Sequence, residues 1–373
     1  MIYRPNPKRG RTTLLLMGAF IFAAEIAAGI LIDHAPMRIR FPQLAQVLEM
    51  ARQLKPSKKI LFLGSSRFGN AVSAEAITEV LHQANVGDGV TVFKANIGAS
   101  DPVVMDFETD KLLAADILPS MAVIEILPEV LSRRNLWLNF HLGRQLRWPE
   151  VWNALPDVYL AGTLYLAVTT RFNAIYTFRS EFQQWAMDGL KLRFESSNFA
   201  DANTRKRRRA NRAAPADVEV LLRGAASGRK NVRGYEIGGL NTRALIRMIE
   251  RYSQLGTTIV FVAPPVSSPY RAAYGSPVDA AYLAYMQQLG KTYGTYFFDY
   301  RHRLSDHHFW TPYYTTTDGK LHFSRLLARE VIVPLIAGHK TSMSSRALPP
   351  SDNPSATAAE GQSLPDAGSR RGG

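Results

Sequence analysis

The 373-residue chain contains no cysteine. This absence excludes disulfide bonds, thiolate catalysis and cysteine-ligated metal sites. The sequence also lacks a phosphate-binding loop, a dinucleotide-binding glycine fingerprint and any spacing typical of metal ligands, so we expect no cofactor and no metal. The chain has fewer acidic than basic residues, with 31 Asp and Glu and 45 Lys and Arg, which gives a net charge of +14. Such an excess is typical of proteins that meet nucleic acid, an anionic membrane surface or an anionic polymer.

One long apolar run is present, near the N-terminus. Residues 13–32, TLLLMGAFIFAAEIAAGILI, are apolar apart from Glu25, and about twenty residues are needed for a helix to cross a bilayer. Four basic residues precede the run, while Asp33 and His34 follow it. The positive-inside rule therefore predicts a single-pass protein of the inner or plasma membrane, with residues 1–12 in the cytoplasm and the main domain on the far side.

A cleaved signal peptide is the alternative for the same run. Its apolar core would be shorter, and no small-x-small cleavage site stands clearly at the end of the run. We therefore expect an uncleaved anchor. Glu25 is costly near mid-span, and the sequence leaves two explanations open: it faces a partner helix, or it is tolerated near a thinned bilayer.

Beyond the anchor, apolar runs alternate with helical patterns. The runs are rich in β-branched and aromatic residues and end in turn residues, which predicts buried strands at 59–64, 90–96, 121–127, 257–264 and 294–300. Helices are expected at 73–84, 101–115, 241–255, 279–292 and 321–337, with Ser73, Asp101 and Asn241 as N-caps. This alternation predicts a three-layer α/β/α domain with a five-stranded parallel sheet.

Two regions depart from this alternation and set the domain boundaries. Residues 137–240 have no convincing strand, and we interpret them as a helical insertion that is rich in aromatic residues and carries a basic loop at 205–212. Residues 339–373 are rich in Pro, Ser, Ala and Gly, which predicts a disordered tail. The expected order is therefore a stalk and first helix at 33–57, a first half-domain at 58–136, the insertion, a second half-domain at 241–338 and the tail.

Candidate functional residues lie where the predicted strands end. Ligands of doubly wound sheets bind at the carboxyl ends of the strands. Ser66 follows the first strand and is the candidate nucleophile. Gly98 follows the second, where its backbone N–H could donate to a substrate oxygen. A serine hydroxyl needs an adjacent base to attack at neutral pH, and a third group to orient that base.

The segments LFLGSSR, ANIGAS and FVAPPVSS resemble blocks of the SGNH/GDSL hydrolases, above all the membrane-anchored branch found in polysaccharide acylation of the cell envelope. The resemblance implies an SGNH/flavodoxin-like sheet and a serine esterase or O-acyltransferase. It places Ser66 as the nucleophile, with Ser65 in place of the usual aspartate. Gly98 is the implied oxyanion donor, and Ser65 and Asn96 are further residues of the oxyanion and substrate site.

Two blocks depart from the family pattern. The third lacks the usual Asn, because the sequence reads IEILPEV. The last block fits in two registers. In one, Asp318 and His322 are the acid and the base, at a spacing of four instead of three. In the other, Gly319 aligns with the family glycine, and Thr311 and Tyr314 stand where the acid and base belong, which implies an impaired enzyme.

Further histidines and the basic loop add alternatives. His307 and His308, with Asp306 beside them, are other candidate bases in the same loop, although SDHHFW also fits a surface turn. The run RKRRRANR at 205–212 has no interleaved aromatic residues for base stacking. Since it is also expected outside the cytoplasm, we interpret it as a solvated loop or a contact for anionic glycan or lipid, and we expect no nucleic acid as partner.

Three functions remain open from the sequence. The first is an enzyme that moves or removes acyl groups on a glycan hydroxyl through Ser66, with Asp318 and His322. The second is a catalytically impaired relative that binds acylated glycan or scaffolds a membrane acylation complex together with an acyltransferase. The third is an anchored structural protein with an unrelated α/β domain.

Overall fold

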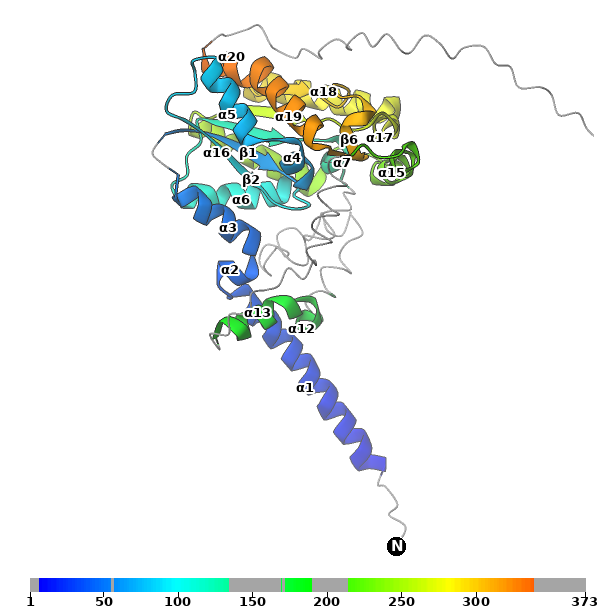
Figure 1. Cartoon of the computed structure of the whole chain (residues 1–373). Coiled ribbons are helices and arrows are strands. Elements are labelled where there is room, and N and C mark those ends of the chain that lie inside the picture. The colour runs from blue at the N-terminus through cyan, green and yellow to red at the C-terminus, as the bar shows by residue number, and fades with distance from the viewer. Residues whose placement is uncertain (1–6, 55–56, 134–168, 170–171, 190–213, 339–373) are drawn as a thin grey trace, which may run out of the picture.

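The computed structural model describes residues 7–54, 57–133, 169, 172–189 and 214–338 (Figure 1). The domain is built on a parallel sheet with the strand order β2-β1-β3-β4-β5. Its strands are β1 (Lys58–Gly64), β2 (Val90–Asn96), β3 (Met121–Glu125), β4 (Thr258–Ala263) and β5 (Tyr296–Asp299). This is the flavodoxin-like order, in which the topology switches direction between β1 and β3. The predicted five-stranded parallel sheet is confirmed.

Helices cover both faces of the sheet, as the alternation of strands and helices predicts. Leu61 and Leu63 of β1 pack on one face, and Ile60 and Phe62 pack on the other, because successive side chains of a strand point in opposite directions. The first face carries α3 (Pro42–Arg52), α6 (Pro102–Ala114), α16 (Gly239–Gln254) and α18 (Gly275–Tyr293). The second face carries α4 (Ser66–Ala71), α5 (Ala74–Gln83) and α19 (Thr317–Leu327).

One further long helix and several short elements complete the described domain. They are α7 (Pro128–Leu131), α15 (Val218–Asn231), α17 (Ser268–Ala272), the 3-10 turn Asp306–His308, and a hairpin of β6 (Phe309–Thr311) and β7 (Tyr314–Thr315). The sequence did not predict the hairpin, because two strands of three and two residues leave no periodic pattern to recognise.

Two of the three expected N-caps are confirmed. The Ser73 hydroxyl accepts from the backbone N–H of Ala76, and the Asp101 carboxylate accepts from two N–H groups of α6. The prediction for Asn241 is wrong. Helix α16 begins after Gly238, whose φ of +155° suits glycine, and Asn241 is buried inside the helix.

The closing helix begins earlier than expected. Thr316 caps it by accepting from the N–H of Gly319, so α19 starts at Thr317 and not near residue 321. A π-helical turn, Ala328–Ile332, and α20 (Val333–Ile336) continue it. His322 therefore lies within the helix, where its side chain is exposed.

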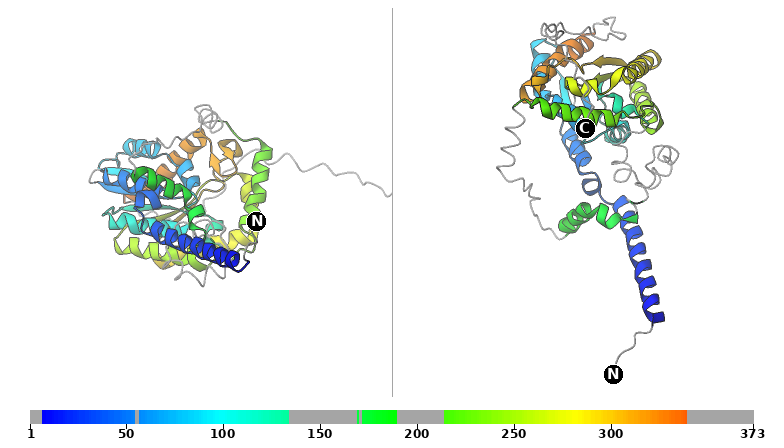
Figure 2. Two further views of the ribbon diagram at one scale, coloured as in Figure 1. Left: turned by 90° about the horizontal axis from the view of Figure 1, so that it is seen from below. Right: turned by 90° about the vertical axis from the view of Figure 1, so that its right-hand side faces the viewer.

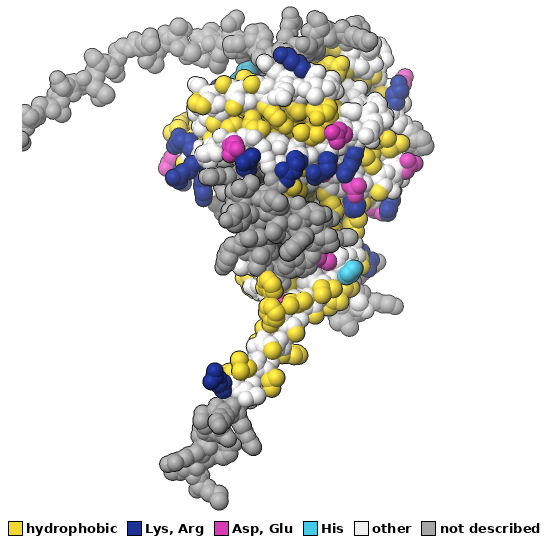
Figure 3. Space-filling model, turned by 180° about the vertical axis from the view of Figure 1, so that it is seen from behind, with side chains coloured by type: hydrophobic (Ala, Val, Ile, Leu, Met, Phe, Trp, Pro, Cys, Tyr) yellow, Lys and Arg dark blue, Asp and Glu magenta, His cyan; other side chains and the backbone are white. Residues whose placement is uncertain are grey.

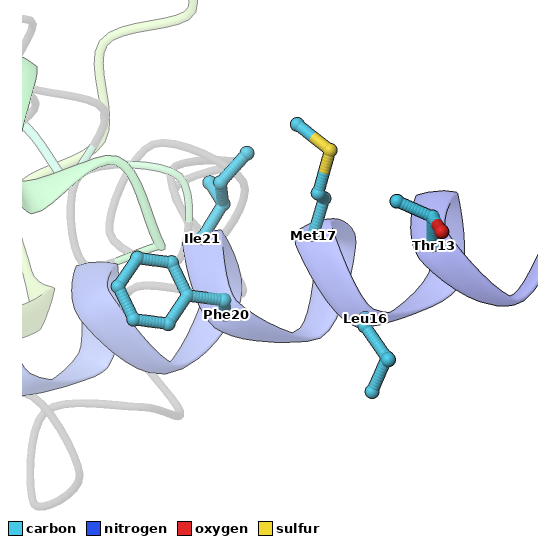
Figure 4. Close-up of a pocket in the computed structure, with 5 residues that line it drawn as sticks. All are labelled: Thr13, Leu16, Met17, Phe20 and Ile21. Carbon is cyan, nitrogen blue, oxygen red and sulfur yellow. The ribbon is translucent and has the colours of Figure 1, made fainter.

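A single long helix, α1 (Pro7–Asp33), projects from the domain (Figure 1). Its stretch Gly10–Asp33 has a mean hydropathy of 2.3 and is long and apolar enough to span a membrane. Figure 3 shows hydrophobic side chains along the projecting helix, with Lys and Arg at its far end and on the domain. Figure 4 shows Leu16, Met17, Phe20 and Ile21 reaching outward from it. Length and composition thus support the predicted anchor, and its topology stays a prediction.

The joint between α1 and the domain is short and tightly packed. Helix α2 (Met37–Arg40) follows α1 directly, and Arg40 pairs with Asp33 at 3.7 Å. The Arg40 guanidinium also lies 4.9 Å from the Phe41 ring and 4.6 Å from the Phe178 ring. Helix α3 then packs against the sheet through Leu44 and its neighbours. The chain therefore passes from anchor to core with the joint held on several sides.

Part of the predicted insertion is described, and it is helical apart from turns and an isolated β-bridge between Ile237 and Ser132. Helices α12 (Ala174–Thr177) and α13 (Arg179–Gly189) lie beside the domain-side end of α1 (Figures 1 and 2). Helix α15 lies against α17. The basic loop at 205–212, the aromatic residues between 137 and 165, and the tail from 339 lie outside the described residues. The predicted domain boundaries stay predictions.

Candidate functional site

Ser66 is the first residue of α4, directly after the turn that ends β1. Ser65 caps this helix, because its hydroxyl accepts from the backbone N–H of Arg67 at 3.1 Å. The Ser65 side chain is buried, whereas Ser66 is exposed. The turn thus presents the Ser66 hydroxyl to solvent at the carboxyl edge of the sheet, where the sequence places it.

Gly64 allows a buried carboxyl to approach this turn from β3. A Cβ atom at position 64 would lie 2.7 Å from both Cβ and Oε2 of Glu125, a separation that folded proteins do not tolerate. Glu125 Oε2 accepts the backbone N–H of Ser65. Burial raises the pKa of Glu125, and its Oε1 has no partner among the described residues. A carboxyl group therefore lies beneath the serine turn.

The hydrogen-bond partner of Ser66 Oγ, among the described residues, is a tyrosine hydroxyl. Tyr314 Oη lies 2.9 Å from Ser66 Oγ. The hairpin of β6 and β7 carries Tyr314 to this point, and its backbone N–H donates to Thr311 Oγ1 at 3.0 Å. Thr311 and Tyr314 are the residues that the second register of the last block aligns with the acid and the base.

His322 and Asp318 make their contacts elsewhere. Asp318 pairs with His308 Nδ1 at 3.3 Å, and the His322 ring stacks on the His308 ring at 5.5 Å. Burial, with His307 nearby, lowers the pKa of His308. Because Thr316 starts the helix early, both predicted residues fall in its first turns, on this histidine cluster. No hydrogen bond joins either of them to Ser66 among the described residues, and their catalytic roles stay predictions.

The remaining histidine alternative is also engaged locally. His307 Nδ1 lies 3.0 Å from the Ser305 hydroxyl. Asp306 accepts the backbone N–H of Ser268 at 2.7 Å and also the hydroxyl of that residue. These contacts fix the SDHHFW turn onto the loop after β4, which agrees with the interpretation of the segment as a surface turn.

Gly98 and Asn96 lie at the end of β2, next to β1. The backbone N–H of Gly98 donates to Gln43 Oε1 of α3 at 3.0 Å. Gln43 is exposed and ends in a flexible amide, so a ligand oxygen can replace its carbonyl on this donor. Asn96 packs under α4, since a Cβ at Gly69 would lie 3.1 Å from the Asn96 Cβ. Its amide atoms are buried and have no partner among the described residues.

A buried ion pair supports the serine turn from below. Arg67 donates to Glu129 Oε1, and the hydroxyls of Tyr270 and Tyr274 each donate to Glu129 at 2.9 Å. Although burial opposes it, the charge of Arg67 lowers the pKa of Glu129. An unpaired charge would be costly here, so the tyrosines and the ion pair must form together.

Aromatic rings stand beside Ser66 on the same hairpin. The Trp310 and Tyr314 rings stack at 5.3 Å, and the Tyr313 ring meets Tyr314 edge to face at 4.9 Å. The Arg67 guanidinium lies 4.4 Å from the Tyr313 ring. All three aromatic side chains are half-buried. We call Trp310, Tyr313 and Tyr314 the aromatic wall.

Sequence reasoning named the strand ends but missed the group that supports them. Arg67, Glu125 and Glu129 form that group, and these three charged residues are at most 6% exposed. The signal was present, because two acidic residues interrupt the apolar run of VIEILPEVL. Buried carboxyls in such a run need partners, and those partners lie far away in the sequence.

The comparisons with known proteins identify no family for this chain. No protein-family model matches the sequence, and no curated protein matches it. Among solved structures, a gut microbial diltiazem-metabolizing enzyme is similar, with 10% identity and a TM-score of 0.30. That match covers 66% of this chain and 37% of the other, so it spans little more than a third of the enzyme's length.

Proposed function

We propose that this chain is a membrane-anchored, SGNH-like binding protein whose Ser66–Tyr314 pair holds a hydroxyl-rich, O-acylated glycan without turning it over. The observation that carries the proposal is the 2.9 Å contact between Ser66 Oγ and Tyr314 Oη. The strand order and the serine turn support the SGNH-like assignment, and the anchor supports a position at the cell envelope.

The Ser66–Tyr314 contact favours binding over catalysis because of what a phenol can do. Free tyrosine holds its proton up to about pH 10, so at neutral pH a phenol donates and accepts hydrogen bonds but does not remove a serine proton. A serine nucleophile needs a base that is largely unprotonated near neutral pH. The described histidines 307, 308 and 322 are engaged with one another and with Asp318.

The ligand class follows from the groups that the site offers. Two exposed or half-exposed hydroxyls can each donate and accept, which matches sugar hydroxyls and acyl carbonyls. The aromatic wall offers apolar faces of the kind that stack on flat apolar surfaces. Gly98 adds a backbone donor once the Gln43 amide moves away. The net charge of +14 favours an anionic polymer among such glycans.

The test compares a tyrosine of the site with a tyrosine outside it. Full-length protein in lipid nanodiscs is assayed for binding to O-acetylated and de-acetylated polysaccharide and for release of acetate. Ser66→Ala and Tyr314→Phe each remove a neutral hydrogen-bonding group, worth about 0.5–1.5 kcal/mol, so binding should weaken about 2- to 10-fold. Tyr293→Phe, at the end of α18, is the matched control, because it removes a phenol hydroxyl outside the serine turn, the hairpin and the aromatic wall, and it should bind like the unchanged protein.

The same experiment decides between binding and catalysis. We expect no acetate release that depends on Ser66 in the unchanged protein. Turnover that Ser66→Ala abolishes would overturn the binding proposal in favour of the esterase. Binding that neither Ser66→Ala nor Tyr314→Phe weakens would remove this site from the interaction altogether.

A further inference from the structure

Helix α12 and its flanking residues lie beside the anchor, at the level of Glu25. Glu25 Oε2 accepts the backbone N–H of Ile175 at 2.8 Å, across 150 positions of the sequence. The Phe22 and Phe172 rings stack at 5.4 Å with their planes 12° apart. The segment 172–178 therefore runs alongside the anchor, as Figures 1 and 2 both show for α12.

The packing continues toward the domain without a gap. Ala174 and Phe178 are fully buried against Ala28, Ile32 and Ile39 of the anchor and of α2. Outward-facing side chains of the same segment are large and exposed. Ile175 is 46% exposed and Tyr176 is 64% exposed. One side of α12 thus packs on α1, and the other side extends the exposed apolar surface of α1.

From this arrangement we infer that the segment 172–178 is a second membrane contact, which inserts Ile175 and Tyr176 into the outer leaflet beside α1. The inference rests on α1 crossing the bilayer. Glu25 lies eight residues before Asp33, which is about 12 Å along a helix. The hydrocarbon core is about 30 Å thick, so a span that ends at Asp33 places the Glu25–Ile175 contact within the outer half.

The Glu25–Ile175 contact solves two problems that a membrane creates. The N–H groups of a helix's first turn have no partner inside the helix, and in lipid an unsatisfied N–H costs several kcal/mol. A carboxylate on a membrane helix is costly for the same reason. Glu25 and the Ile175 N–H satisfy each other. The sequence left open that Glu25 faces a partner helix, and the helix that it faces here is α12 of the same chain.

Charged residues mark where the segment leaves the lipid. Arg179 directly follows Phe178, and its guanidinium donates to the backbone oxygen of Tyr176 at 2.9 Å and lies 4.5 Å from the Tyr176 ring. Tyrosine and arginine in this pairing are typical of the membrane–water boundary, where the ring meets the acyl chains and the charge reaches the headgroups. The lipid bilayer is therefore the occupant that we assign to this surface.

The test uses the absence of cysteine, because single cysteines can be labelled without background. Full-length protein with Ile175→Cys or Tyr176→Cys carries an environment-sensitive fluorophore and is reconstituted into phosphatidylcholine–phosphatidylglycerol vesicles. Phe20→Cys, on the exposed surface of α1, is the lipid control. Leu222→Cys, 56% exposed on α15 in the domain, is the matched aqueous control. Quenching by acyl-chain nitroxide lipid and by aqueous iodide is compared.

We expect labels at 175 and 176 to lose fluorescence to the nitroxide lipid as the label at 20 does, and to be protected from iodide, with the reverse at 222. Iodide quenching at both 175 and 176, with position 20 still in lipid, would overturn the inference while the anchor stands. Protection from both quenchers would show a protein cover and overturn it as well. Iodide quenching at 20 would remove the anchor on which the inference rests. None of these readouts depends on Ser66 or on glycan binding.

Discussion

The buried Glu108 on α6 allows a prediction of how the free energy of unfolding changes with pH. Its side chain is fully buried, and neither carboxyl oxygen has a partner among the described residues. Burial raises the pKa of Glu108 well above its ordinary 4.5, so the folded protein keeps this proton to higher pH than the unfolded chain does. In the unfolded chain this group ionises above its ordinary pKa. Folding at higher pH must therefore restore a proton, and the stability falls as pH rises from 4.5 toward the folded pKa.

The cost at pH 7 has an upper bound. Each pH unit is worth about 1.36 kcal/mol, and the 2.5 units between the ordinary pKa of 4.5 and pH 7 give at most about 3.4 kcal/mol. Glu108→Gln is close in shape to the protonated acid and never ionises. We compare the free energy of unfolding of the variant with that of the unchanged protein. This difference should be larger at pH 7 than at pH 4.5, in favour of the variant, by up to this amount. The cost of burying an amide is the same at both pH values and cancels.

The assay is thermal unfolding of the full chain in detergent micelles, followed by near-ultraviolet circular dichroism at pH 4.5 and pH 7. For a domain of this size about 1 kcal/mol shifts the midpoint by about 2–4 °C, so the variant's advantage should grow by several degrees. Glu250→Gln, an exposed carboxyl on the neighbouring α16, is the matched control. A difference between Glu108→Gln and the unchanged protein that stays constant with pH would refute the reasoning.

Two further predictions concern the serine turn, with the midpoint of thermal unfolding as the readout. Gly64→Ala should destabilise the protein by about 1–3 kcal/mol, because its Cβ would lie 2.7 Å from Glu125 Cβ. Gly98→Ala is the control and should change the stability little, since the nearest contact of its Cβ would be 3.6 Å away. Equal effects of the two substitutions would contradict the close approach of β3. Glu129→Gln should cost about 3–5 kcal/mol by leaving Arg67 buried without its counter-charge, whereas Tyr274→Phe should cost about 1 kcal/mol for one hydrogen bond. A mild effect of Glu129→Gln would show that Arg67 finds another partner.

The sheet could be predicted from the sequence because its signal is local. Each strand is a buried apolar run bounded by turn residues, and the observed bounds of β1 and β2, 58–64 and 90–96, nearly coincide with the predicted ones. Ser73 and Asp101 carry their own capping signal. Asn241 misled the prediction because Asn is a common cap, yet the left-handed glycines at 238 and 239 set the helix start.

The partner of Ser66 could not be predicted, because it depends on where a helix begins. Two registers fitted the last block, one with Asp318 and His322 and the other with Thr311 and Tyr314 at the acid and base positions. The Thr316 cap fixes the start at Thr317. The hairpin that carries Tyr314 is too short to leave a periodic pattern. Contacts such as Glu25 with Ile175 lie 150 positions apart, a separation at which no local rule of spacing applies.

The packed joint between anchor and domain has a consequence for how this protein finds its ligand. Asp33, Arg40 and Phe178 hold the joint, and α3 continues from it straight into the core. A long flexible tether would let the site sweep a deep volume at a low local concentration. If α1 spans a membrane, a stiff joint would confine the site to one height above it, and diffusion in the bilayer plane would become the main search. With the proposed glycan as ligand, the site would meet polymer near the membrane surface and not material held farther out.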